Sequence, residues 1–186
     1  LAGAAAAPRG RAAQAASVPV VGVVDFYAPQ PIDGALGVVP ERFSADDLSA
    51  ALARAGEGRV TVVPRGQVSA AEAALRWRGS DALNFSRLGA LAQRVGADRL
   101  VVGWITLFSF SPMDDASPPG GQYLGTVNLV VQVFDAALGR LVWQTKGTAL
   151  GEGIMLGLVM QQVLHQALAP TVAPTLAALT GGGSSP

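Results

Sequence analysis

The sequence predicts an α/β (α+β) fold, with a single mixed sheet of about five strands, helices packed on it and the element order β-α-β-α-α-β-β-β-α. Helical periodicity separates the early apolar runs, which predicts crossover connections between parallel strands. The late apolar runs follow one another across short turns, which predicts antiparallel hairpins. With 186 residues, 50% of them hydrophobic, the chain is long enough to form one domain with a substantial core.

The first strand and the first helix have distinct signatures. Residues 18–26, VPVVGVVDF, form a continuous valine-rich run that is typical of a strand buried on both faces. After a loop over residues 27–42, Ser44 with Asp47 matches a capping box that would start a helix, and the acid would also complement the helix dipole. An apolar stripe then follows at helical spacing, and Gly56 is expected to end the helix.

The second strand is expected over residues 59–68, where Pro64 interrupts it and places it at an edge of the sheet. Ser69 with Glu72 matches a second capping box that would open the next helix. A third helix is expected to start at Asp81 and to end at Gly96, a residue suited to a left-handed stop.

The remaining strands are expected over residues 99–110, 123–136 and 139–150, and the first of these is apolar on both faces, which predicts a central position. A turn-rich loop separates the first two, and a short hairpin turn with Gly139 separates the last two. Gly151–Gly153 are expected to lead into the last helix, which Pro170 and Pro174 would kink or break.

The domain is expected to span residues 18–180. Residues 1–17 are Ala-rich and fit equally well the remnant of a secretory signal or a flexible linker, and residues 181–186 fit a flexible tail. The absence of cysteine excludes disulfides and thiolate sites. A net charge of zero argues against nucleic acid as a partner, and no apolar run is long enough to predict a transmembrane helix.

Several stretches together resemble a known family. VGVVDF (21–26), VTVVPR (60–65), LVVGWI (100–105) and VQVFDAALGRLVWQ (131–144) occur in the order and spacing of the periplasmic domain shared by the curli-secretion lipoprotein CsgG, the penicillin-binding-protein activator LpoB and related ring-forming envelope lipoproteins. The resemblance covers residues 18–168. It implies a non-enzymatic protein of the periplasm or outer membrane that binds partners or forms rings. The family's lipid-anchor cysteine is missing here, so the anchor either lies upstream of Leu1 or this member has none.

Enzymatic and ligand-binding sites find little support in the sequence. The single histidine, His165, lies on the polar side of the last helix and is expected to be solvated. Asp114 and Asp115 form an acidic pair in a loop, which we also expect to be solvated. The helix start at Gly151–Gly153 could hold an anion, although it lacks the Lys-Ser/Thr of a phosphate-binding loop. We therefore predict no catalytic residue, no metal and no cofactor.

Two groups of residues are candidates for contact with a protein partner. Arg76, Trp77 and Arg78 combine residue types that are enriched at interaction hot spots, although the end of a solvated helix would look the same. Phe108, Phe110 and Tyr123 approach the loop at the end of the sheet and would form a contact patch if exposed.

The sequence therefore predicts a bacterial envelope protein that acts by protein–protein contact, either as a structural component or as an adaptor. A homo-oligomeric ring or filament is one form that this could take. The alternative is a small-molecule or anion-binding periplasmic module that uses the helix start at Gly151–Gly153.

Overall fold

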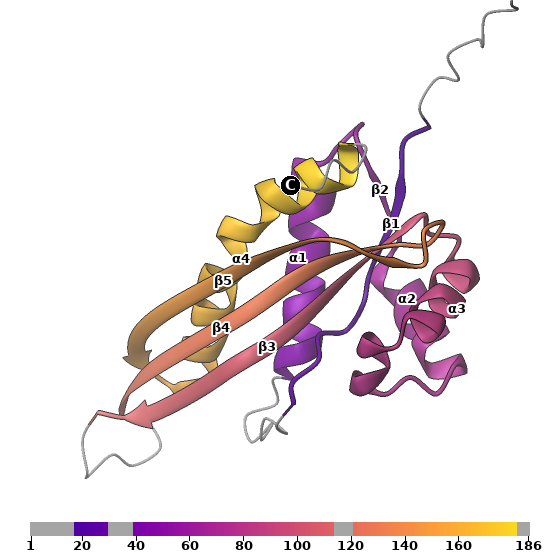
Figure 1. Ribbon diagram of the computed structural model, residues 1–186. Coiled ribbons are helices and arrows are strands. Elements are labelled where there is room, and N and C mark those ends of the chain that lie inside the picture. Colours follow the sequence, from indigo (N-terminus) through magenta and orange to yellow (C-terminus); the bar gives the residue numbers. More distant parts are fainter. Residues whose placement is uncertain (1–16, 30–38, 114–120, 182–186) are drawn as a thin grey trace, which may run out of the picture.

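The computed structural model describes residues 17–29, 39–113 and 121–181. They form one five-stranded sheet with the order β2-β1-β3-β4-β5 (Figure 1). The strands are β1 (Val20–Val23), β2 (Thr61–Val62), β3 (Arg99–Pro112), β4 (Gln122–Asp135) and β5 (Arg140–Ile154). The helices are α1 (Pro40–Ala55), α2 (Arg65–Ala74), the 3-10 helix η1 (Gly79–Leu83), α3 (Phe85–Val95) and α4 (Leu156–Thr180). The predicted fold class and element order are confirmed.

Strand pairing follows the prediction as well. β1 pairs in parallel with β2 and with β3, and β4 is antiparallel to β3 and to β5. β3 lies in the middle of the sheet and β2 is an edge strand that ends before Pro64, as expected. The β4–β5 turn is closed by Asp135, whose Oδ1 accepts the backbone N–H groups of Ala137 and Leu138, and Gly139 has φ 63°.

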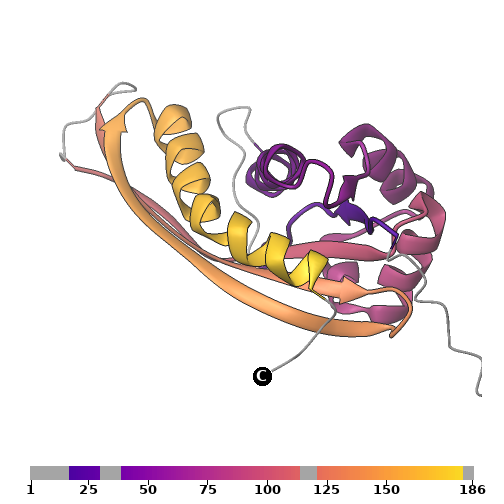
Figure 2. The same cartoon turned by 90° about the horizontal axis from the view of Figure 1, so that it is seen from above.

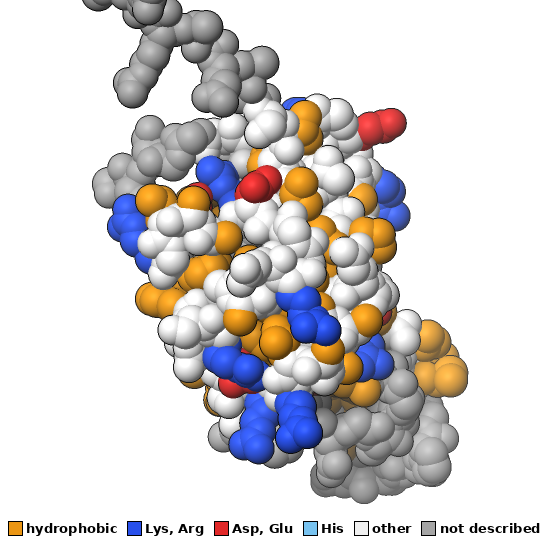
Figure 3. All heavy atoms as spheres, turned by 90° about the vertical axis from the view of Figure 1, so that its right-hand side faces the viewer, with side chains coloured by type: hydrophobic (Ala, Val, Ile, Leu, Met, Phe, Trp, Pro, Cys, Tyr) orange, Lys and Arg blue, Asp and Glu red, His pale blue; other side chains and the backbone are white. Residues whose placement is uncertain are grey.

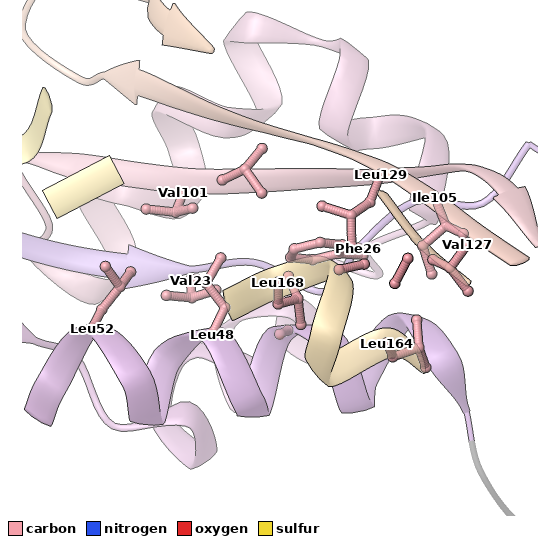
Figure 4. Close-up of a cluster of buried hydrophobic side chains, with 14 of the residues drawn as sticks. Val23, Phe26, Leu48, Leu52, Val101, Ile105, Val127, Leu129, Leu164 and Leu168 are labelled. Atoms are coloured by element: carbon pink, nitrogen blue, oxygen red, sulfur yellow. The ribbon is translucent and has the colours of Figure 1, made fainter. Parts of the chain in front are cut away.

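The sheet separates two hydrophobic cores. The larger core lies between the sheet and the helices α1 and α4, and Figure 4 shows side chains from β1, β3, β4 and both helices converging there. Its labelled members are Val23, Phe26, Leu48, Leu52, Val101, Ile105, Val127, Leu129, Leu164 and Leu168. The smaller core lies on the other side, under α2 and α3. We call these two sides the inner and the outer face of the sheet.

The predicted start of α1 is too late by about one turn. The helix begins at Pro40, after Val39 as N-cap, and Ser44 is buried inside it. Proline is favoured in the first turn because its fixed φ suits a helix and its missing N–H would be unpaired there anyway. Asp47 therefore does not lie in the first turn. The helix ends before Gly56, as predicted.

The predicted start of α2 is also too late by about one turn. The helix begins at Arg65, directly after Pro64, and the supposed cap Ser69 lies within it. Glu72 is buried and accepts a hydrogen bond from the backbone of Asp25, so it does not complete a capping box. Pro64 ends one element and starts the next, and the second strand is correspondingly shorter than expected.

The third helix, in contrast, starts later than predicted. Asp81 lies in the 3-10 helix, and α3 is capped by Asn84, whose side chain accepts the backbone N–H groups of Ser86 and Arg87. The predicted stop at Gly96 is confirmed, with φ 67°.

The largest difference concerns β5 and α4. Gly151 and Gly153 do not start a helix, because they continue β5 and pair with Gly125 and Tyr123 of β4. α4 begins at Leu156 and continues through Pro170 and Pro174 without a break. In Figure 2, α4 curves along the concave inner face of the long strands.

Candidate functional site

The sequence-predicted contact residues lie at two different ends of the molecule. Arg76, Trp77 and Arg78 follow α2, at the end that Figure 3 views. Trp77 is half-buried against the outer core, and the guanidinium of Arg87 lies 5.9 Å from its ring centroid. Figure 3 shows the basic side chains of this end in several separate places, interrupted by apolar and uncharged atoms.

Phe108, Phe110 and Tyr123 lie on the inner face, near the opposite end of the long strands. Phe108 and Phe110 are partly buried against the larger core, and their ring centroids are 4.7 Å apart. The structure therefore brings Phe108 and Phe110 together on the side that α4 covers, places Tyr123 on the same face of the neighbouring strand, and does not join these residues to Trp77. Their role in partner binding stays a prediction.

Sequence reasoning missed the surface on the outer face of β3, β4 and β5. A β-bulge between Ile105 and Leu107 exchanges the two faces of β3, so that Leu107 points outward although Val101 and Ile105 point inward. Paired residues share a face, and three rows follow from the register. The rows are Leu107–Asn128–Thr148, Ser109–Thr126–Leu150 and Ser111–Leu124–Glu152. We call these nine residues, together with Ile154, the open outer face.

This open outer face combines apolar and small polar side chains. Leu150 and Ile154 are 64% and 62% exposed, and Leu107 and Leu124 are also exposed. Glu152 is its only charged member. The outer core under α2 and α3 includes none of these residues, and no helix of the described residues lies over them in Figure 2. Exposed apolar side chains grouped on a flat sheet are typical of a protein contact surface.

β5 adds a free edge to this surface. It is the last strand in the sheet order and runs for 15 residues, whereas the opposite edge strand β2 has only 2 residues and is followed by proline. Long edge strands without proline present unpaired backbone groups that can bind another strand. One edge of this sheet is therefore blunted and the other is left open.

A cluster of charged side chains lies where β1 meets α1 and α2. Arg65 donates hydrogen bonds to the carbonyl oxygen of Val23 and to the carboxylate of Asp25, and its Nε lies 2.9 Å from Oδ1 of Asp46. The backbone N–H of Asp25 donates to Oε1 of Glu72 at 3.0 Å. Arg65 thus ties together β1, α1 and α2, which gives Asp46 of α1 a structural role.

Burial dominates the ionisation of Glu72. Removal from water is the largest of the causes that raise the pKa of Glu72 to about 7, and the nearby charge of Asp25 acts in the same direction. The hydrogen bond from Asp25 and the charges of Arg65 and Arg42 act in the opposite direction but do not outweigh burial. The sequence carried a signal for this residue, since Glu72 falls on the same helix side as the buried Val68 and Ala71.

An open cavity of about 510 Å³ lies beside this cluster. It is lined by Asp25, Phe26, Tyr27, Ala28, Glu41, Trp77, Gly79 and Ser80. Because Arg65 already pairs with Asp25, the cavity does not offer two free carboxylates to a cation. We regard this corner as a structural junction.

The other candidates raised by the sequence have simple structural roles or lie elsewhere. His165 is solvent-exposed, as predicted, and its Nδ1 lies 2.8 Å from Oδ2 of Asp47, which connects α4 to α1. The prediction of an anion site at Gly151–Gly153 required a helix start there, and it is wrong because both glycines are strand residues. Asp114 and Asp115 lie outside the described residues. Within the described ranges, no three metal-ligating side chains come together, and no helix is long and apolar enough to span a membrane.

The fold can be compared with known proteins at this point. No family model matches the sequence, and no curated protein matches it significantly. The lipoprotein GNA1162 from Neisseria meningitidis superposes with a TM-score of 0.55 at 16% identity, over 84% of this chain and 99% of that one. A PelC dodecamer from Paraburkholderia phytofirmans gives a TM-score of 0.51 at 16% identity, over 89% and 92% of the two chains. The chain has the fold of these two proteins.

The LpoB C-terminal domain from Salmonella enterica is also similar, at 20% identity over 74% of this chain and 86% of that domain, with a TM-score of 0.43. The resemblance predicted from the sequence is confirmed as a likeness of fold, which GNA1162 and PelC carry.

Proposed function

We propose that this chain is a non-enzymatic structural protein of the bacterial envelope that works by binding further copies of itself. The observation that carries the proposal is the open outer face, where four exposed apolar side chains lie on a side of the long strands that no described helix covers. Burying such side chains against a second protein surface removes apolar area from water, which stabilises the contact.

Three further observations support the proposal. The PelC structure of the same fold is a dodecamer, and GNA1162 is a lipoprotein, which favours an envelope location. The open outer face is almost free of charge, so two copies of it do not repel each other. The only histidine pairs with Asp47 on the surface and connects α4 to α1, which gives it a structural role.

The proposal predicts a loss of self-association when the face is made polar. In the variant with Leu150→Ser and Ile154→Ser, we expect the native mass of the wild-type oligomer, measured by light scattering on a sizing column, to fall to that of a monomer or a smaller species. Both side chains are exposed, so circular dichroism and the melting temperature should change little.

Leu138→Ser is the matched control, because Leu138 is 58% exposed but lies in the β4–β5 turn, away from the open outer face. It should leave the native mass unchanged. A wild-type chain that is monomeric at all concentrations would contradict self-assembly, and a pull-down from envelope extract would then test the adaptor role.

A further inference from the structure

We propose that two copies join through antiparallel pairing of their β5 edges, centred on Ala149. This inference rests on the proposed function, because it names the surface through which the copies first meet. It starts from the unequal edges of the sheet: the β2 edge is short and ends at Pro64, whereas β5 is long and contains no proline. An open edge of this length is a ready template for strand addition.

The charges of β5 select the register. Its only charged residues are Arg140, Lys146 and Glu152. In antiparallel pairing about Ala149, Lys146 of each copy lies opposite Glu152 of the other, so that two opposite-charge pairs form across the contact. Centring on Glu152 would place Glu152 opposite itself. Centring on Lys146 would pair Arg140 with Glu152 but would also place Lys146 opposite itself, so only the register about Ala149 forms opposite-charge pairs without a like-charge pair.

The other side chains of this segment fit the same register. Thr148 would lie opposite Leu150 of the second copy, and Gly147 opposite Gly151. Lys146, Thr148, Leu150 and Glu152 are exposed, whereas Gly147 and Ala149 are covered on the inner face, where α4 packs. The pairs therefore match outer residues with outer residues, as an antiparallel ladder requires.

The pairing also explains how the open outer face can become larger. Joining two β5 edges makes one sheet in which β3, β4 and β5 of each copy continue into those of the other. Leu150 and Ile154 of both copies then lie near the centre of a continuous apolar face. Edge pairing thus supplies backbone hydrogen bonds, and the enlarged face remains available to further copies.

Charge reversal tests the register directly. Lys146→Glu and Glu152→Lys each place like charges opposite each other in both symmetric positions, and we expect each to raise the dimer dissociation constant, measured by sedimentation, at least about tenfold at low salt. The double variant restores opposite charges and should return the constant to near the wild-type value. Arg140→Glu is the control, because it changes the charge equally on the same strand but has no partner residue in this register.

Cross-linking gives a second, independent readout, because the chain contains no cysteine. A mixture of the Thr148→Cys chain and the Leu150→Cys chain should form disulfide-linked heterodimers faster than either chain alone forms homodimers, since directly opposite residues have Cα atoms about 4.5–5.5 Å apart.

The outcomes separate this inference from the proposed function. Self-association that is insensitive to both charge reversals, with no preferred heterodimer, would overturn the β5 pairing and leave self-assembly through the open outer face standing. A monomeric wild-type chain would overturn both.

Discussion

Gly147→Ala is expected to destabilise the protein by about 3 kcal/mol or more, the upper part of the range for overpacked cores. A Cβ atom on Gly147 would lie 1.9 Å from the carbonyl oxygen of Ala167 in α4, which is far inside contact distance. The obstacle is helix backbone, so no side-chain rotation can relieve it and α4 must move away from β5. Since α4 covers much of the larger core, that movement opens contacts well beyond the mutated position.

Thermal and urea unfolding measure this effect, and for a chain of this size the melting temperature should fall by roughly 6–12 °C. Gly89→Ala is the matched control: it makes the same chemical change inside α3, where nothing lies within 4 Å of the added atom. Alanine is the better helix former, so the control should gain about 1 kcal/mol. A loss below about 1 kcal/mol for Gly147→Ala would contradict the close seating of α4 on β5.

Much of the fold could be predicted because apolar runs and turn residues act locally. The valine-rich run before Asp25 forms a strand, although only over Val20–Val23, and the long apolar strand around Trp104 and the Asp135–Gly139 turn keep their predicted structure. The helix starts were harder to predict. Ser44 and Ser69 matched capping boxes, but Pro40 and Pro64 start both helices one turn earlier, and packing then buries Ser44 and Glu72.

The candidate contact surface could not be predicted from sequence in the same way. The bulge near Thr106 turns Leu107 outward, and a bulge leaves no periodic signal that alternation could detect. Gly151 and Gly153 looked like a loop because glycine has low strand propensity, yet α4 requires small residues there and pairing with β4 extends the strand. Because β5 extends to Ile154, Leu150 and Ile154 are exposed residues of the sheet. The sequence around them did not predict this position.

Glu72→Gln is expected to remove a marked pH dependence of stability. Burial raises the pKa of Glu72 to about 7, from 4.5 for an exposed glutamate. Between these two values the unfolded chain releases the proton while the native chain keeps it, so the free energy of unfolding falls as pH rises. The loss through this window is on the order of 3 kcal/mol. Below pH 4.5 both states hold the proton, and the stabilisation is fully present.

Glutamine keeps an oxygen that can accept the backbone N–H of Asp25 but carries no titrating proton. The variant and the wild type should therefore have similar stabilities near pH 4.5, and the variant should be more stable at pH 8. Urea unfolding at several pH values gives both curves, and their difference removes the contributions of Asp25, Arg65 and Arg42, which both proteins share. Glu57→Gln, at an exposed glutamate, is the control. A buried carboxyl that must ionise destabilises the native state as pH rises, so the curves of the wild type and Glu72→Gln should diverge between pH 4.5 and 7. Parallel curves would instead show that Glu72 titrates like an exposed acid and would contradict the prediction.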